Sequence, residues 1–495
     1  MIRQQLGRLA KNALTYGVGQ VLNRFISFLL LPVFTAYLTP SDYGVISILG
    51  LMILVLTPTF SLGFGTATGV CYFEGDDRSR KSSTIWTAFL ILLISVSVLA
   101  ILGMTFVQQI GWVLFQTSGY EYFVTISIIS TCLSILSTPF ILYLQFEEKA
   151  RTFITLTIIT TLMSIGFSVL LVVVLRKGVQ GFVEGRLLGQ AAGTIVYMIV
   201  VAPSLRFGFS WGIGQELLKL GIPMIPSFAS LFVLQQINKY MLQWFSGLDT
   251  VGVYTVGNNL GLILSLLVTG FTTAWYPYFM SFVDRQDEAR VLFGRILTYY
   301  VFGFGMLSLL FYLFAKPAVI IMTQPSYFEA YKVVGLSATA QFLMGMFNIL
   351  LPGIYFAKDV KYVSGIQAIA AFIAVGLNLA LIPMFNLLGA AIALVLGILA
   401  MVILQQRWNL KRNYLEVKYE WTRIAWFALF YISYVLIMVW QPKFSLIGET
   451  VFFIVAAGLI PIMSYFFLNV TERQTLWSMT GQFIPSLFKR LSVKI

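Results

Sequence analysis

The sequence predicts an all-α integral membrane protein with about 14 transmembrane helices, in two six-helix lobes that form a parallel pseudo-repeat, plus two C-terminal helices. The composition, the recurring apolar stretches and an internal similarity lead to this prediction. Of the 495 residues, 59% are hydrophobic and 10% are charged, whereas soluble domains carry about 25% charged residues. So few charges could not cover the surface of a soluble chain of this length, and we expect the chain to lie in a bilayer.

Apolar stretches of about 20 residues, long enough to cross a bilayer, follow one another along the whole chain. We assign about fourteen spans, at 13–38, 44–66, 84–107, 121–145, 152–175, 179–203, 217–244, 252–280, 292–315, 331–356, 363–385, 388–408, 422–440 and 447–468. Some of them exceed 20 residues, which we interpret as tilt or as an end turn in the membrane interface.

The basic residues orient these spans. Of the 32 Lys and Arg residues, 24 fall on the side that holds both termini, five fall on the other side, and three lie inside spans. Cytoplasmic loops of membrane proteins carry the excess of Lys and Arg. We therefore expect both termini in the cytoplasm, and we attribute the net charge of +13 to these loops rather than to a nucleic-acid partner.

An internal similarity suggests the repeat. "YLTPSDYGVISI" joins spans one and two, and "FSGLDTVGVYTV" joins spans seven and eight, with Gly44 and Gly252 in equivalent positions six spans apart. An even number of spans gives both halves the same orientation, and such halves usually enclose a central cavity and rock about it. The expected domains are 1–205 and 206–410, each a six-helix lobe, and 411–495, which holds two further spans and a cytoplasmic tail.

Several function classes are disfavoured by what the sequence lacks. It contains no histidine, which removes the commonest general base and metal ligand. The connections between spans are short, and none contains a Gly-rich phosphate-binding loop. We therefore expect neither catalytic residues nor a metal site, no cofactor and no enzymatic activity, and we leave a coupling ion open.

Polar residues line one face of span one. Gln20, Asn23, Arg24 and Ser27 follow at steps of three and four, the spacing of one helix face. An arginine at the bilayer centre costs about 3 kcal/mol by insertion measurements, so this face is expected to look into the bundle. The alternative is a structural arginine that pairs with a buried carboxylate or caps the carbonyls of a kinked helix.

Span seven carries a second polar stripe, which contains Gln235, Asn238 and Lys239. A cation among amides suits a sugar phosphate, because the cation meets phosphate oxygens and the amides meet hydroxyls. Both stripes are therefore candidate substrate-binding residues of a cavity. The alternative for Lys239 is that its side chain snorkels outward to the membrane interface.

Four further polar residues are weaker candidates. Asn259 and Asn348 lie inside spans, where an amide can equally form a hydrogen bond between helices. Glu184 and Arg186 lie near the outer end of span six. They are two residues apart and so do not face each other on a helix, which also allows a role at the membrane interface.

Three segments together resemble one family. "NALTYGVGQVLNRFISFLLLPVFTAYLTPSDYGVISIL", "LLKLGIPMIPSFASLFVLQQINKYML" with "VGVYTVGNNLGLI", and "NLALIPMFNLLGAAIALVLG" are similar to bacterial polysaccharide and O-antigen repeat-unit flippases. These belong to the multidrug/oligosaccharidyl-lipid/polysaccharide (MOP) exporter superfamily. Many relatives have an aspartate before the basic residue of span seven, where this chain has Asn238 and Lys239, so a coupling role for that acid does not carry over.

The resemblance implies two six-helix lobes around a cationic cavity and alternating access. The implied substrate is an undecaprenyl-diphosphate-linked oligosaccharide, an O-antigen, capsule or exopolysaccharide repeat unit. The implied location is the bacterial plasma membrane, where membrane lipids and a glycan polymerase or ligase would be partners. A lipid II flippase, a multidrug or cation antiporter of the same superfamily, and a membrane polymerase or ligase are the competing interpretations.

Overall fold

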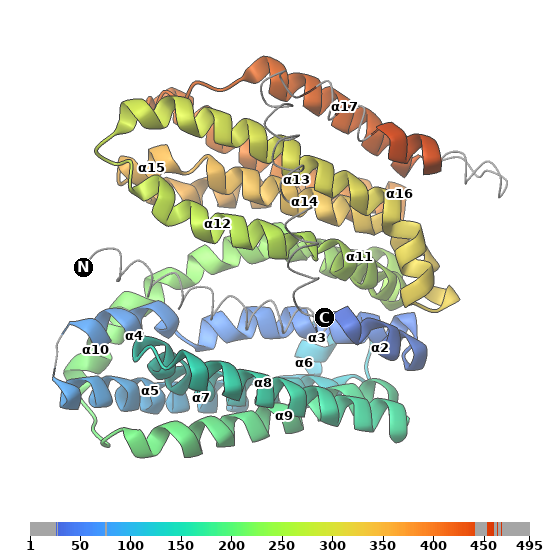
Figure 1. Cartoon of the computed structure of the whole chain (residues 1–495). Coiled ribbons are helices and arrows are strands. Elements are labelled where there is room, and N and C mark those ends of the chain that lie inside the picture. Colours follow the sequence, from blue (N-terminus) through green and yellow to red (C-terminus); the bar gives the residue numbers. More distant parts are fainter. Residues whose placement is uncertain are drawn as a thin grey trace, which may run out of the picture.

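The structure is a computed structural model that describes residues 26, 28–74, 77–440, 453–459, 463 and 467, with only the backbone at Ser227. Every element assigned within these residues is a helix, and no strand occurs among them. The predicted all-α class is confirmed. Figure 1 shows the helices in two groups, with α10 and α11 leading from one to the other.

The N-terminal group contains the first eight α-helices of the described chain and two short helices of other types. They are α2 (Leu31–Tyr37), α3 (Pro40–Phe60), α4 (Phe64–Phe73), α5 (Arg78–Thr105), α6 (Val107–Phe115), α7 (Glu121–Phe146), α8 (Ala150–Val169) with the π-helical η1 (Leu170–Val174), and α9 (Gly178–Val201) with η2 (Ala202–Ser204). The start of α3 follows from local chemistry, because Thr39 and Asp42 form a reciprocal capping box there.

The connecting helix α10 (Trp211–Gly221) leads through η3 (Ile222–Met224) into the C-terminal group. That group contains α11 (Ile225–Gly261), α12 (Leu264–Met280), α13 (Gln286–Met322), η4 (Pro325–Ala330), α14 (Tyr331–Ile349), α15 (Pro352–Phe356), α16 (Lys361–Arg412) and α17 (Trp421–Val439).

Two of these helices are each interrupted by a break between two of the predicted spans. α16 has 52 residues, about 78 Å at 1.5 Å per residue, against a hydrocarbon core of about 30 Å. It is interrupted at Asn386, where φ is 54°, between two of the predicted spans. α11 is likewise interrupted at Gly247, where φ is 79°.

The described residues contain nine helices long and apolar enough to cross a membrane, or ten when one bent pair is included. These confirm a multi-pass membrane protein. The total of fourteen spans stays a prediction, as do the domain boundaries.

The two groups share a core at one end only. We call the end with the basic loops the inner end and the opposite one the outer end, following the predicted orientation. One apolar cluster lies wholly in the C-terminal group, and another, around Phe140 and Tyr197, lies wholly in the inner half of the N-terminal group. The contacts that join the two groups in the other clusters, such as Ile48 with Val251 and Leu31 with Val256, lie toward the outer end, although the cluster of Ile48 also runs along α4 and α5 to Leu217 of α10. The outer end is therefore closed by shared packing.

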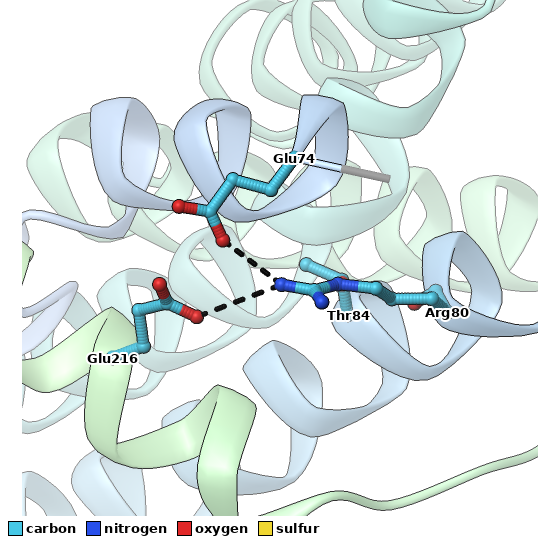
Figure 2. A network of polar contacts seen from close by, with 4 residues as sticks. All are labelled: Glu74, Arg80, Thr84 and Glu216. Carbon is cyan, nitrogen blue, oxygen red and sulfur yellow. Dashed lines mark hydrogen bonds and ion pairs between the residues drawn. The ribbon is translucent and has the colours of Figure 1, made fainter. Parts of the chain in front are cut away.

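Helix α10 is fastened to the N-terminal group. Figure 2 shows the Arg80 guanidinium of α5 between two carboxylates, at 2.9 Å from Glu74 and 3.9 Å from Glu216 of α10. The backbone N–H of Ser210 donates to the Thr87 hydroxyl at 3.1 Å. Leu217 of α10 is fully buried in the cluster that α3, α4 and α5 also line.

Candidate substrate-binding site

The polar stripe predicted on span one lies outside the described residues. Gln20, Asn23, Arg24 and Ser27 all belong to this part of the chain. The described end of the span is α2, which leads directly to the outer turn before α3. The role of these four residues in the cavity stays a prediction.

The stripe on span seven lies in the first half of α11, and one of its members has an internal partner. The Asn238 amide is 2% exposed and donates a hydrogen bond to the Tyr254 hydroxyl, in the second half of the same helix. The Asn238 side-chain oxygen accepts from the backbone N–H of Lys239 at 3.0 Å. Asn238 thus ties spans seven and eight together across the break at Gly247.

Lys239 and Gln235, one turn apart on α11, are both half-buried. None of the ion pairs found among the described residues includes Lys239. An ammonium group inside a span usually pairs with another charge or faces a water-filled cavity. Lys239 thus has no carboxylate partner in the described part of the chain, and its role in substrate binding stays a prediction.

Asn259 points into the space between the two groups. It is exposed, although its neighbours Asn258 and Leu260 are buried. Helical spacing puts Asn259 on the face of Gly252 and Thr255, and Thr255 contacts Ser47 of α3. Asn259 therefore lies just inward of the contact between α3 and α11, and its role as a ligand stays a prediction.

Asn348 has local partners instead. Its amide donates to the Met344 carbonyl at 3.0 Å, within α14. Its backbone carbonyl accepts from the Trp275 indole of α12 at 3.3 Å. These bonds give Asn348 a part in holding α12 against α14.

Glu184 is the centre of a network at the outer end of α9. Its carboxylate accepts hydrogen bonds from Tyr122 of α7 at 2.6 Å, from Gln180 at 2.7 Å and from Lys177 at 2.9 Å. Three donors satisfy the carboxylate and join α9 to α7. This arrangement corresponds to the interfacial alternative, and it leaves Glu184 occupied rather than paired with Arg186.

Arg186 faces the interior side of α9. At 100° per residue, it lies opposite Leu188 and Ile195, two exposed apolar side chains of the kind that meet lipid. It shares its face with Phe182, whose ring contacts Phe34 of α2 with the centroids 5.3 Å apart. Arg186 is itself exposed, and none of the ion pairs among the described residues includes it.

Sequence reasoning missed one feature of this region. Gly44 and Gly252 were informative as repeat markers, but the structure also places them against each other, beside a hydroxyl pair formed by Ser47 and Thr255. The signal was present in the sequence, since both pairs have the same spacing. No group of three or more His, Cys, Asp or Glu side chains comes together within the described ranges.

The fold is that of MOP-superfamily transporters. The chain is similar to the lipid II flippase MurJ in an inward closed conformation, with a TM-score of 0.72 and 13% identity over 93% of this chain and 99% of that chain. It is also similar to an inward-facing multidrug resistance MATE family transporter, with a TM-score of 0.58 and 15% identity over 79% of this chain and 98% of that one. At this identity, both likenesses show the fold alone.

The family follows from the sequence comparison. A family model described as "Polysaccharide biosynthesis protein" matches residues 9–283, and the chain belongs to this family. A relative from Haemophilus influenzae (strain ATCC 51907 / DSM 11121 / KW20 / Rd), "Lsg locus putative protein 1", is 22% identical over 317 residues, which cover 61% of this chain and 73% of the relative. The resemblance seen in the sequence is thereby confirmed.

Proposed function

We propose that the protein is a flippase that moves an undecaprenyl-diphosphate-linked oligosaccharide from the inner to the outer leaflet of the bacterial plasma membrane by alternating access. The family supports a role in polysaccharide biosynthesis. The observation that carries the proposal is Lys239, a half-buried cation inside a span with no carboxylate partner among the described residues.

The physical problem of such a substrate is its head group. A diphosphate and several sugar hydroxyls cannot enter hydrocarbon unaccompanied, because unpaired charges and polar groups lose their hydration there. A cation inside the protein offsets that loss for the phosphates, and amides such as Gln235 and Asn259 can bond the hydroxyls. The acyl chain of the carrier needs no such path, since lipid solvates it.

The proposed site also includes Arg24 with Gln20, Asn23 and Ser27, which lie outside the described residues. The guanidinium of Arg24 would hold phosphate oxygens in a bidentate fork, which an ammonium cannot form. Arg186 is a further candidate because it shares a face of α9 with Phe182, whose ring contacts Phe34 of α2. The proposal gives the chain no catalytic step; a glycan polymerase or ligase would act on the delivered substrate.

Two alternatives share the fold. The likeness to MurJ raises transport of lipid II, and the likeness to a multidrug transporter raises export of cationic compounds. Lipid II and the proposed oligosaccharide lipid both carry a diphosphate, so the same cations would bind either of them. A cationic drug would be repelled by Lys239, because like charges at short range disfavour each other.

Purified protein in nucleotide-free vesicles tests these possibilities with three fluorescent probes. They are a polyprenyl-diphosphate-linked oligosaccharide, lipid II and ethidium. We expect transfer of the oligosaccharide lipid between leaflets, with or without an imposed ion gradient, and loss of most of that transfer in Lys239→Gln. Lys361→Gln is the matched control, since Lys361 is exposed at the first residue of α16 and should leave transport unchanged.

Transport of ethidium alone would overturn the proposal. Transport of lipid II without transport of the oligosaccharide lipid would show that the proposed substrate is wrong, whereas the proposed class, a flippase of lipid-linked glycans, would stand.

A further inference from the structure

The two groups meet where α3 crosses α11, and we call this contact the seam. The residues that touch each other there occupy equivalent positions in the two halves of the repeat. Gly44 of α3 lies against Leu248 of α11, and Gly252 of α11 lies against Pro40 of α3. The spacing between Gly44 and Gly252 equals the spacing between Pro40 and Leu248 in the sequence. The contact is therefore made twice, once from each half of the chain.

Only glycine fits at the two crossing points. A Cβ atom at Gly44 would overlap the carbonyl oxygen of Leu248, and a Cβ atom at Gly252 would overlap that of Pro40. Backbone lies directly against backbone there, and a backbone atom cannot swing away as a flexible side chain can. Small residues allow this kind of close approach between membrane helices.

A hydroxyl pair continues the seam one turn inward. The Ser47 and Thr255 side chains are hydrogen-bonded at 2.8 Å, both 8% exposed, and are 208 positions apart in the chain. Gly44 and Gly252 have the same spacing in the sequence. Two equivalent residues can touch each other only on the pseudo-twofold axis that relates the halves. The seam thus lies on the axis about which the two groups are related.

The seam separates the interior from the outer end. Inward of it, α3 and α11 no longer cover each other, since Leu54 of α3 is 51% exposed and Asn259 of α11 is exposed. Outward of it, the Tyr327 hydroxyl donates to the Leu38 carbonyl at 2.8 Å, which again joins the two groups. Anything held beside Asn259 has to pass this seam to leave toward the outer end.

We propose that the Gly44–Ser47 and Gly252–Thr255 segments form the outer gate of the transport path, closed in this structure, and that they part when the substrate is released. This inference rests on the proposed function for its direction of transport. The backbone contact and the hydroxyl pair form the centre of the seam, and the buried side chains of Ile48 and Val251 pack beside them. Both glycines are needed so that the gate can close.

A reversible cross-link tests whether the seam must open. The double variant Ser47→Cys/Thr255→Cys, in a chain whose Cys71 and Cys132 are replaced by serine, is oxidised with copper phenanthroline in vesicles. We expect the disulfide to form and transport to stop, with recovery after reduction. Each single-cysteine variant under the same oxidant is the control and should keep its transport. Undiminished transport by a fully cross-linked chain, or failure of the two thiols to cross-link, would overturn the gate.

A second measurement needs no substrate. Thr255→Cys is labelled by a membrane-impermeant maleimide added at the outer face, in chains that also carry Gly44→Ala or Gly50→Ala. Gly50 lies on the same helix, and a Cβ there would meet nothing within 4 Å. We expect Gly44→Ala to hold the seam open and to raise the labelling rate about tenfold over Gly50→Ala.

Equal labelling in the two variants would contradict the gate. If Gly44→Ala does not fold, the cross-link alone decides. If the wild-type chain transports none of the glycan lipids, the proposed function fails, while the labelling rates and the formation of the cross-link still decide whether the seam opens.

Discussion

Among the predicted residues of span seven, the structure separates those with internal partners from those without. Asn238 bonds Tyr254, whereas no carboxylate in the described residues pairs with Lys239. Periodicity in the sequence could place both on a helix, but it could not tell which would find a partner. The partner of Asn238 lies in the next span and is brought near by the break at Gly247.

Removing the hydroxyl of Tyr254 tests this internal role of Asn238. Tyr254 is fully buried, so Tyr254→Phe leaves the Asn238 amide without a partner and should cost about 1–3 kcal/mol of unfolding free energy. Thermal unfolding in detergent measures the change. Asn238→Leu combined with Tyr254→Phe removes both polar groups and should recover part of the loss. A double variant as unstable as the sum of the single ones would contradict a direct bond.

At the scale of the element, the sequence predicted the helices better than their contacts. The predicted spans 363–385 and 388–408 coincide with the two parts of α16, because apolar runs alone identify membrane helices. The placement of α10 on α4 and α5 could not be predicted, since it depends on how three separate segments fold back. The same holds for Glu216, which comes from a distant position in the chain to meet Arg80 beside the nearby Glu74 (Figure 2).

Two adjacent residues of α10 show what holds it in place. Leu217 is fully buried, with 0% of its area exposed, whereas the Glu216 side chain is 36% exposed. Leu217→Ala should cost about 2–5 kcal/mol, and Glu216→Ala at most about 1 kcal/mol. Chemical denaturation of both variants in the same detergent compares them. A larger loss from Glu216→Ala would mean that the ion pair, rather than apolar packing, fastens α10.

For the whole molecule, the repeat was visible in sequence as two similar turns, and the structure brings these two turns together at Gly44 and Gly252. This contact depends on how the two halves of the chain are placed relative to each other, and a local sequence pattern does not contain that information. The two groups share packing toward the outer end and have separate clusters elsewhere, which gives a closed outer side. This is the arrangement expected of one state of a transporter that alternates between two.

The predicted orientation can be tested with single cysteines. Ser79, at the start of α5, should be inside, and Gln116, after α6, should be outside, because the basic loops lie on the inner side. A membrane-impermeant maleimide added to intact cells should label Gln116→Cys and leave Ser79→Cys unlabelled. Labelling of Ser79→Cys alone would invert the orientation and, with it, the assignment of the outer gate.

The central claim is that cations inside the membrane carry a diphosphate across it. One fluorescent oligosaccharide is attached to a polyprenyl diphosphate or to a polyprenyl monophosphate, and its transfer between vesicle leaflets is timed. The wild-type chain should move the diphosphate about tenfold faster, because the second phosphate adds charge for Lys239 and Arg24 to bind. Lys239→Gln and Arg24→Gln should each reduce this preference, and Lys361→Gln should keep it. Equal rates for the two lipids in the wild-type chain, or an unchanged preference in both cavity variants, would contradict the account.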